Sequence, residues 1–200
     1  MIHPSGGMRR LPPCWPLLCR RSAVLVTACM LCSLLPGRAQ SRVDNEYRFK
    51  AVYLLNFLQF IQWRADSSAG QNSGPIIIGV AGEDPFGPLL DQTVTGELVG
   101  GRRIVVRRFR DIAEVDSCNL LFIPRTLRKG NPPVLRELAR RGIVTVGESG
   151  EFATEGPVLN FYLNDGKLRF EINETALREA GFTISSRLMK LARIIPSNGE

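Results

Sequence analysis

The first 39 residues decide how much of this chain can contribute to a fold. Residues 1–21 carry four arginines and no acid, residues 23–35 form an apolar run, and Gly37-Arg38-Ala39 is a small-x-small site. This order is typical of a secretory signal cut after Ala39. The apolar run is shorter than the roughly 20 residues that a membrane span needs. We therefore expect residues 40–200 to fold as one exported domain without residues 1–39.

Removal of this segment changes the chemistry that the chain can perform. It takes away the only histidine, His3, and four of the five cysteines, so that Cys118 alone remains. It also takes away five arginines, which lowers the formal net charge from +7 to +2. The basic footprint that nucleic-acid binding needs is then missing, and a single cysteine excludes a disulfide within the mature chain.

The signal segment has two alternative interpretations, one for the first residue of the mature protein and one for the start of translation. Val26-Thr27-Ala28-Cys29 resembles a lipoprotein cleavage box, which would leave an acylated Cys29 as the anchor, although the apolar run continues where a polar tether is expected. Met8 is an alternative start that gives a signal of ordinary length.

Residues 45–63 are expected to form a long helix. One apolar stripe has helical spacing, and it consists of Tyr47, Ala51, Leu54, Leu58 and Ile61. Phe49, Tyr53, Phe60 and Trp63 form a second, aromatic row. A helix so apolar must be covered on more than one side. The cover is either the rest of its own domain or a partner, such as a second copy in a homodimer.

The rest of the chain alternates short apolar runs with helical segments. The predicted strands are 75–80, 103–109, 119–123 and 143–146, followed by 158–163 and 167–172, which flank the hairpin signal Asn164-Asp165-Gly166. The predicted helices are 85–92, with Asp84 as N-cap, 133–141, 174–180 and 185–195. This order predicts a single α/β layered domain with a mainly parallel sheet, an antiparallel C-terminal hairpin and flanking helices.

The segment 79–87 joins a strand to a helix, where α/β folds often bind ligands. Glu83, Asp84, Phe86 and Gly87 are therefore a possible ligand loop. No phosphate-loop spacing is present, and the two acids would repel an anion. A capped helix with Phe86 packed into the core explains the same residues, and this structural interpretation is favoured.

Five arginines surround the apolar core of the strand at 103–109, at Arg102, Arg103, Arg107, Arg108 and Arg110. A phosphate-binding patch is one interpretation. The other is a strand with one buried face whose arginines reach solvent, with their charge offset by the acids at Asp111, Glu114 and Asp116.

Few catalytic arrangements are available to the mature chain. Histidine-dependent nucleophilic catalysis lacks its base, and zinc would have one thiol and carboxylates only. Cys118 begins an apolar run, which favours a buried side chain, whereas a redox thiol would need exposure and a lowered pKa. We expect a protein without enzymatic activity and without a metal or cofactor.

The closing helix, residues 185–195, is the strongest candidate for a partner surface. Ile184, Leu188, Leu191 and Ile195 are expected to face the core. Contact with a partner is expected from the side chains outside this stripe, which are Arg187, Met189, Lys190, Arg193 and Ile194. A terminal helix docked on its own domain is the alternative.

Taken together, several blocks resemble the YfiR-like family of periplasmic proteins. In chain order they are 50–57 (KAVYLLNF), 78–80 (IGV), 84–87 (DPFG), 118–123 (CNLLFI), 143–146 (IVTV), 170–173 (FEIN) and 184–192 (ISSRLMKLA). The resemblance runs from Tyr47 to Ile195. Arg64 stands where the family usually has proline, and the disulfides common in the family have no counterpart here.

The resemblance implies a non-enzymatic periplasmic regulator with an α/β fold that is often dimeric. Its best-known members restrain an inner-membrane diguanylate cyclase by binding the cyclase's periplasmic sensory domain, which limits cyclic-di-GMP output and biofilm formation. An outer-membrane lipoprotein can sequester such a regulator. A periplasmic module that binds a small molecule is the rival function.

Overall fold

The computed structural model describes residues 37–62, 74–127, 132–149 and 156–196, with side chains from Asn45 onward. The chain divides into two compact units, Met1–Val43 and Asp44–Glu200, and the second is described below. The signal segment up to residue 36, its alternatives Met8 and Cys29, and Arg64 lie outside the described residues. No helix within the described ranges has the length and apolarity needed to cross a membrane.

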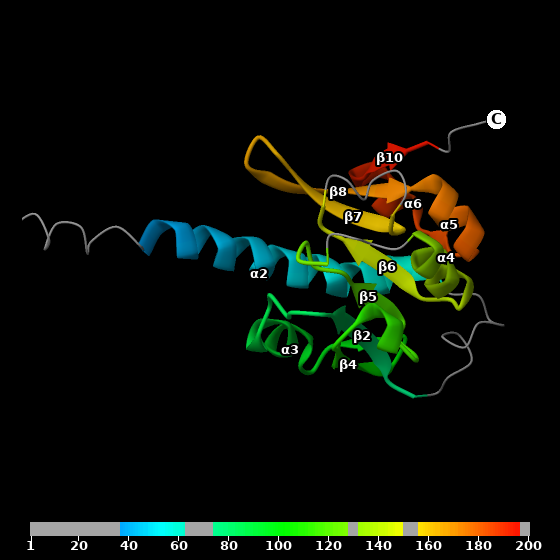
Figure 1. Ribbon diagram of the computed structural model, residues 1–200, viewed down its shortest axis with the longest axis horizontal. Coiled ribbons are helices and arrows are strands. Elements are labelled where there is room, and N and C mark those ends of the chain that lie inside the picture. The colour runs from blue at the N-terminus through cyan, green and yellow to red at the C-terminus, as the bar shows by residue number, and fades with distance from the viewer. Residues whose placement is uncertain (1–36, 63–73, 128–131, 150–155, 197–200) are drawn as a thin grey trace, which may run out of the picture. The chain divides into compact units, whose positions relative to one another are not determined.

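The centre of the domain is an eight-stranded sheet with the spatial order β10-β8-β7-β6-β5-β2-β4-β3 (Figure 1). Its strands are β2 Ile76–Ala81, β3 Leu98–Val99, β4 Arg102–Phe109, β5 Leu120–Phe122, β6 Val144–Gly147, β7 Leu159–Asn164, β8 Lys167–Asn173 and β10 Arg193–Ile195. Strands from β4 to β7 pair in parallel, and the β7–β8 hairpin is antiparallel. The predicted fold class is confirmed.

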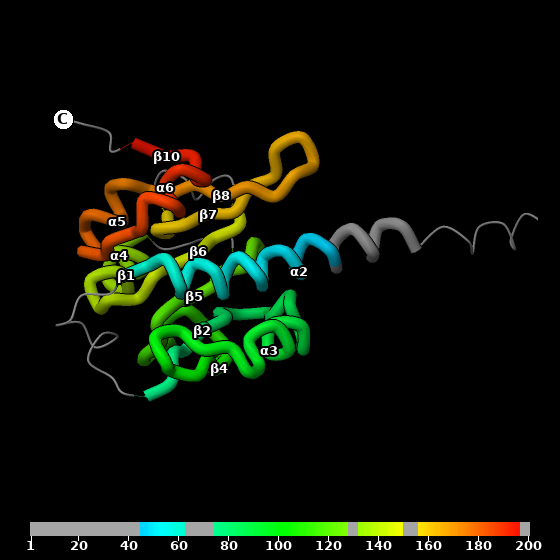
Figure 2. Tube along the Cα trace, turned by 180° about the vertical axis from the view of Figure 1, so that it is seen from behind, coloured from blue at the N-terminus to red at the C-terminus, as the bar shows by residue number. Residues whose placement is uncertain are grey.

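The helices cover both faces of this sheet. They are α2 Gly37–Phe60, α3 Pro88–Val94, α4 Pro132–Arg140, α5 Glu174–Ala180 and α6 Ser186–Leu191, with a 3₁₀ turn, η1, at Ile112–Glu114. Figure 2 shows α2 crossing one face over β6, β5 and β2. Side chains of α2, α3 and α6 share one buried cluster with that face, while those of α4 form a second cluster with Phe109, Cys118 and Leu121 on the other face.

The apolar stripe predicted for α2 is the part of the helix that meets the sheet. Tyr47, Ala51, Leu54, Leu58 and Ile61 are all at most 9 % exposed. The second, aromatic row is covered only in part, since Tyr53 packs against the core whereas Phe49 is 60 % exposed. The helix ends at Phe60, because Ile61 and Gln62 form strand β1, which pairs with β9 (Thr183–Ile184) in a separate two-stranded sheet.

The predicted helix at 85–92 is shifted along the chain. α3 begins at Pro88 with Gly87 as its N-cap, so the prediction that Asp84 caps the helix is wrong. Asp84 Oδ1 instead accepts a hydrogen bond from the backbone N–H of Phe86 at 2.8 Å. This local Asx turn competes with a helical start and delays the helix by three residues.

The predicted closing helix at 185–195 is wrong in its second half. α6 ends at Leu191, and Arg193–Ile195 form β10, which runs parallel to β8. Of the expected core-facing stripe, Ile184 and Leu188 are buried, but Leu191 is 70 % exposed. The local spacing favours a helix, yet Ile194 and Ile195 are β-branched residues that pack well on a pleated sheet. Pairing with β8 outweighs the helical pattern.

Candidate functional site

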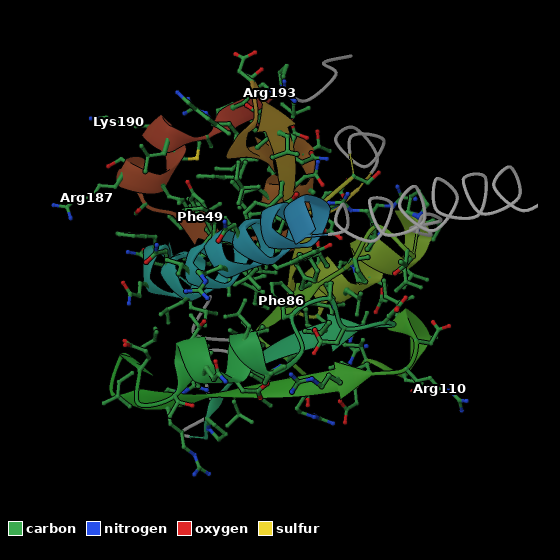
Figure 3. The ribbon with its side chains drawn as sticks, turned by 90° about the vertical axis from the view of Figure 1, so that its left-hand side faces the viewer. Phe49, Phe86, Arg110, Arg187, Lys190 and Arg193 are labelled. Atoms are coloured by element: carbon green, nitrogen blue, oxygen red, sulfur yellow. The ribbon has the colours of Figure 1, made fainter. Side chains whose placement is uncertain are left out.

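The last two elements of the described chain form a surface with exposed cations and exposed apolar side chains. α6 is capped by Ser185, whose Oγ accepts from the backbone N–H of Leu188 at 3.4 Å. Leu188 is buried and Met189 packs partly against the core. Several side chains of this surface are exposed, and we give the name C-terminal patch to two cations and two apolar residues among them: Arg187, Lys190, Leu191 and Ile194. In Figure 3, Arg187 and Lys190 extend away from the domain beside α6.

Arg193, the third cation among the five residues expected to contact a partner, is held by its own domain. Its Nε donates to Glu171 Oε2 at 3.0 Å, and its Nη2 donates to the same oxygen. The guanidinium also lies over the ring of Tyr162, 4.1 Å from its centroid. Hydrogen bonds to Glu171 raise the pKa of Arg193. We call this arrangement the Arg193 clasp, since it ties β10 to the β7–β8 hairpin.

The partner of Arg193 is a buried carboxylate. The side chain of Glu171 is 2 % exposed, and its Oε1 accepts from Asn160 Nδ2 at 2.8 Å. A buried carboxylate without a cation costs several kcal/mol. The ion pair with Arg193 therefore favours the return of the chain to the sheet after α6, where β10 pairs with β8.

A second group of charges lies where α2 meets the ends of β5 and β6, with Lys50 and Glu148 buried and Arg125 exposed. We call it the ion cluster, and its members are Glu46, Tyr47, Lys50, Arg125 and Glu148. Lys50 Nζ donates to Glu46 and, at 2.5 Å, to Glu148 Oε2. Arg125 Nη2 donates to Glu46 Oε1 at 2.9 Å.

The charges of the ion cluster are balanced, and Glu148 is the centre of its hydrogen bonds. Glu148 Oε1 also accepts from the Tyr47 hydroxyl at 3.1 Å and from the backbone N–H of Arg125 at 2.8 Å. Burial, and then the charge of Glu148, raise the pKa of Tyr47, which therefore stays protonated. Two cations offset two carboxylates, so the charges of the ion cluster are paired with one another. Sequence reasoning missed this cluster, although the spacing of Glu46 and Lys50 on a helix is a recognisable signal.

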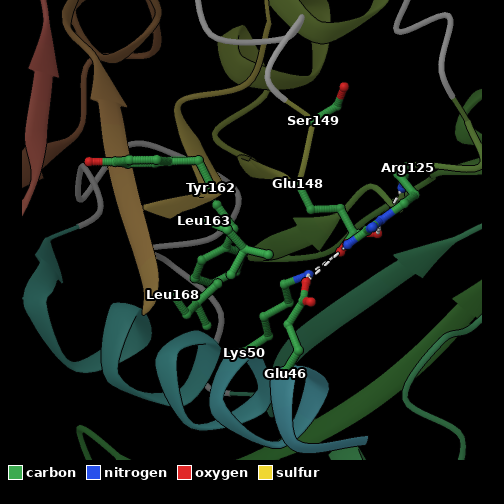
Figure 4. A pocket seen from close by; sticks show the side chains of 9 residues that line it. Glu46, Lys50, Arg125, Glu148, Ser149, Tyr162, Leu163 and Leu168 are labelled. Carbon is green, nitrogen blue, oxygen red and sulfur yellow. Dashed lines mark hydrogen bonds and ion pairs between the residues drawn. The ribbon is translucent and has the colours of Figure 1, made fainter. Parts of the chain in front are cut away.

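A cavity of about 490 Å³ opens beside the ion cluster. Figure 4 shows Glu46, Lys50, Arg125 and Glu148 on one side of it and Tyr162, Leu163 and Leu168 on the other. Volume and mixed lining are within the range of small-molecule sites. Tyr162 belongs both to the cavity, which it lines, and to the Arg193 clasp, where its ring stacks on the guanidinium.

The possible ligand loop does not border this cavity. Asp84 and Asp91 both accept from Arg108, at 2.8 Å to Asp84 Oδ2 and 2.5 Å to Asp91 Oδ2, while the Gly87 carbonyl accepts from the same guanidinium at 2.9 Å. These hydrogen bonds raise the pKa of Arg108 and lower that of Asp91. Phe86 is 4 % exposed and packs on Tyr47 and Phe122, and Glu83 is exposed. The loop is closed onto β4 by internal contacts.

The five arginines around β4 are not brought together as a phosphate site. Arg107 pairs with Asp116, Arg108 pairs with Asp84 and Asp91, and Arg102 donates to the Gly74 carbonyl at 2.7 Å. Arg103 and Arg110 are exposed, and Arg110 points into solvent at the far side from α6 in Figure 3.

Cys118 lies in the second buried cluster and is 6 % exposed. Burial raises the pKa of its thiol to about 12. A neutral, enclosed thiol reacts slowly with oxidants, so this position is poorly suited to redox sensing. Within the described ranges, no group of three His, Cys, Asp or Glu side chains could hold a metal ion.

Comparison with protein families gives a match. The model of the YfiR/HmsC-like family, which carries the designation DUF4154, matches residues 47–193. That family consists of periplasmic regulators of diguanylate cyclases, with a regulatory rather than a catalytic role. A search among curated proteins found no match.

Proposed function

Because the chain belongs to the YfiR/HmsC-like family, we propose that it is a periplasmic protein that represses a membrane-anchored diguanylate cyclase by binding the cyclase's periplasmic sensory domain. The family match over residues 47–193 carries this proposal. Two observations support a contact function: the charges of the ion cluster are mutually paired, and the C-terminal patch leaves cations and apolar side chains exposed.

The proposed contact surface contains the residues expected from the sequence. Arg187, Lys190 and Ile194 are the exposed members, Met189 is half-buried, and Arg193 acts through the Arg193 clasp. Repression follows if the regulator binds the inactive state of the sensory domain more tightly than the active state. Moving that equilibrium from 1:99 to 99:1 requires about 5.5 kcal/mol of differential affinity.

Export is part of the proposal, since the sensory domain lies outside the cytoplasm. We propose that residues 1–39 direct secretion and are cut after Ala39, which leaves residues 40–200 as the regulatory domain. Mass spectrometry of the protein from the envelope checks this step: a free amino terminus at Gln40 supports it, and a lipid on Cys29 contradicts it. A homodimer and sequestration by an outer-membrane lipoprotein are further proposals that the same preparation can test.

The direct test uses the native host. Tagged protein is cross-linked in whole cells, the inner membrane is solubilised, and bound proteins are identified. Recovery of a membrane protein that has a cytoplasmic diguanylate cyclase domain supports the proposal. The control is a deletion strain in which the tagged protein restores the wild-type phenotype. If no diguanylate cyclase is recovered from this strain in repeated experiments, the proposal is contradicted.

The cavity favours a second candidate function, a module that binds a small molecule. The site would be the cavity beside the ion cluster and not the loop at Glu83–Gly87, because Arg108 closes that loop. Thermal-shift screening of purified protein tests it. A metabolite that stabilises the wild type, but not an Arg125→Gln variant, supports the second function.

A further inference from the structure

Two cations of the C-terminal patch have no counter-charge within the described part of the chain. Arg187 and Lys190 are three positions apart on α6, which places them on one side of the helix. Neither forms an ion pair with any residue that the structure describes. The sequence contains no acid from Phe182 to Pro196. This differs from β4, where Arg107 and Arg108 each pair with an aspartate.

The same surface exposes apolar area between and beside these charges. Leu191 follows Arg187 by four residues, on the same side of α6, and at 70 % it is the most exposed large apolar side chain of the described residues. Ile194, on β10, is 36 % exposed. Burial of an exposed leucine in an interface is favourable, and an exposed ion pair usually contributes less. Leu191 can add apolar contact area to the interface, and the cations select the partner.

We propose that the C-terminal patch binds an acidic, amphipathic protein segment in which an apolar side chain covers Leu191 and Ile194 while flanking carboxylates pair with Arg187 and Lys190. The inference rests on the proposed function, since it states what the contact region of the cyclase's periplasmic domain presents. Arg193 takes no part as a contact, because its guanidinium belongs to the Arg193 clasp.

A membrane surface fits this patch less well. A basic residue near an anionic leaflet contributes about 1 kcal/mol, so two cations give about 2 kcal/mol. Stable membrane anchoring takes stronger signals, since even one buried acyl chain gives only marginal binding. An acidic protein segment satisfies both cations and covers both apolar side chains at once.

The test measures how tightly the proposed exported form, residues 40–200, binds three defined probes. The first is a fluorescent peptide of alternating Glu and Leu, the second is the same peptide with Lys in place of Glu, and the third is a phosphatidylglycerol vesicle. We expect binding to the Glu-Leu peptide that weakens with salt. The double variant Arg187→Glu, Lys190→Glu is expected to weaken it at least tenfold, and Leu191→Ser several-fold. The control Arg103→Glu, Arg110→Glu, which makes the same charge change on β4 and directly after it, is expected to leave it unchanged.

Equal binding of the Lys-Leu peptide, equal losses in both double variants, or preferential binding to vesicles would overturn the inference. The Arg193→Met variant separates positioning from contact. This variant is expected to bind the peptide more weakly and to show faster hydrogen exchange at the backbone amide of Ile194. Weaker binding with unchanged exchange would contradict a positioning role. If the cyclase domain is later found to bind the Arg187→Glu, Lys190→Glu variant normally, this inference fails and the proposed function stands. If the peptide binds as expected but no cyclase is recovered from cells, the proposed function fails.

Discussion

Lys50 lies on a helix face that is otherwise apolar, and its ammonium group is buried between two carboxylates. Its side chain is 1 % exposed, and that of Glu148 is fully buried. Whether such a cluster stabilises a fold relative to apolar residues depends on how completely its charges are paired. Here the backbone N–H of Arg125 and the Tyr47 hydroxyl complete the coordination of Glu148.

We predict that Lys50→Met lowers the free energy of unfolding by about 3 kcal/mol, because a buried carboxylate is left without its main cation. Arg125 remains close by and limits the loss. Urea denaturation gives the measurement. The control is Arg103→Met, which removes an exposed cation and should cost less than about 0.5 kcal/mol. A loss below 1 kcal/mol for Lys50→Met would show that the ion cluster is solvated.

Cys118 contributes to stability in a way that depends on pH. Burial raises the pKa of its thiol from 9.0 to about 12 in the folded protein. The folded state thus favours the neutral thiol, so its contribution is complete below pH 9 and is lost as the pH rises toward 12. The loss is about 1.4 kcal/mol for each pH unit within this window.

The free energy of unfolding of the wild type is expected to differ from that of Cys118→Ala in its dependence on pH. Their stabilities measured by urea denaturation should keep a constant difference from pH 6 to pH 8.5, and the wild type should then lose more stability than the variant up to pH 11. Tyrosine and lysine titrations are common to both proteins and cancel. Parallel curves up to pH 11 would refute the burial of the thiol.

At the scale of elements, the β7–β8 hairpin depends on an unusual backbone. Asp165 has φ +50° and Gly166 has φ +71°, which is the pair of left-handed residues that a type I′ turn requires. A Cβ at Gly166 would meet no atom within 4 Å, so any cost of a side chain there comes from the backbone alone.

Gly166→Ala is therefore expected to destabilise the protein by about 1 kcal/mol. Gly74→Ala provides the control, since Gly74 also has open space around it but lacks a positive φ. That substitution should be neutral or slightly stabilising. Equal effects of the two substitutions on the urea midpoint would mean that the hairpin turn does not impose this conformation.

Elements whose pattern is local could be predicted from the sequence, and those that depend on distant partners could not. The strands β2, β4, β5 and β6 follow from short apolar runs, and the hairpin follows from Asn164-Asp165-Gly166. The end of α6 depends on Glu171, 22 positions before Arg193 in the chain. A helical spacing at 184–195 carries no information about a buried carboxylate on another strand.

The residues of the candidate site could likewise be predicted only where their pattern is local. Arg187, Lys190 and Ile194 could be named from the sequence because they lie outside an apolar stripe, and they are exposed. Leu191 was assigned to the core by the same stripe, and it is exposed because α6 ends with it. Lys50 and Glu148 are 98 positions apart, so their pairing follows only from the fold.

At the scale of the whole molecule, both edges of the sheet are short. β10 has three residues and is followed by Pro196, while β3 has two. Short edges with charge and proline resist strand addition by another chain. Contact with a partner through side chains of α6 and β10 is therefore more consistent with this fold than extension of its sheet.

We propose that this protein, once exported, restrains a diguanylate cyclase. The most direct measurement is the cytoplasmic cyclic-di-GMP concentration in the native host. Deletion of the gene should raise it several-fold, the full-length protein should restore it, and a version that lacks residues 1–39 and stays in the cytoplasm should not. An unchanged concentration after deletion, or restoration by the cytoplasmic version, would contradict the claim.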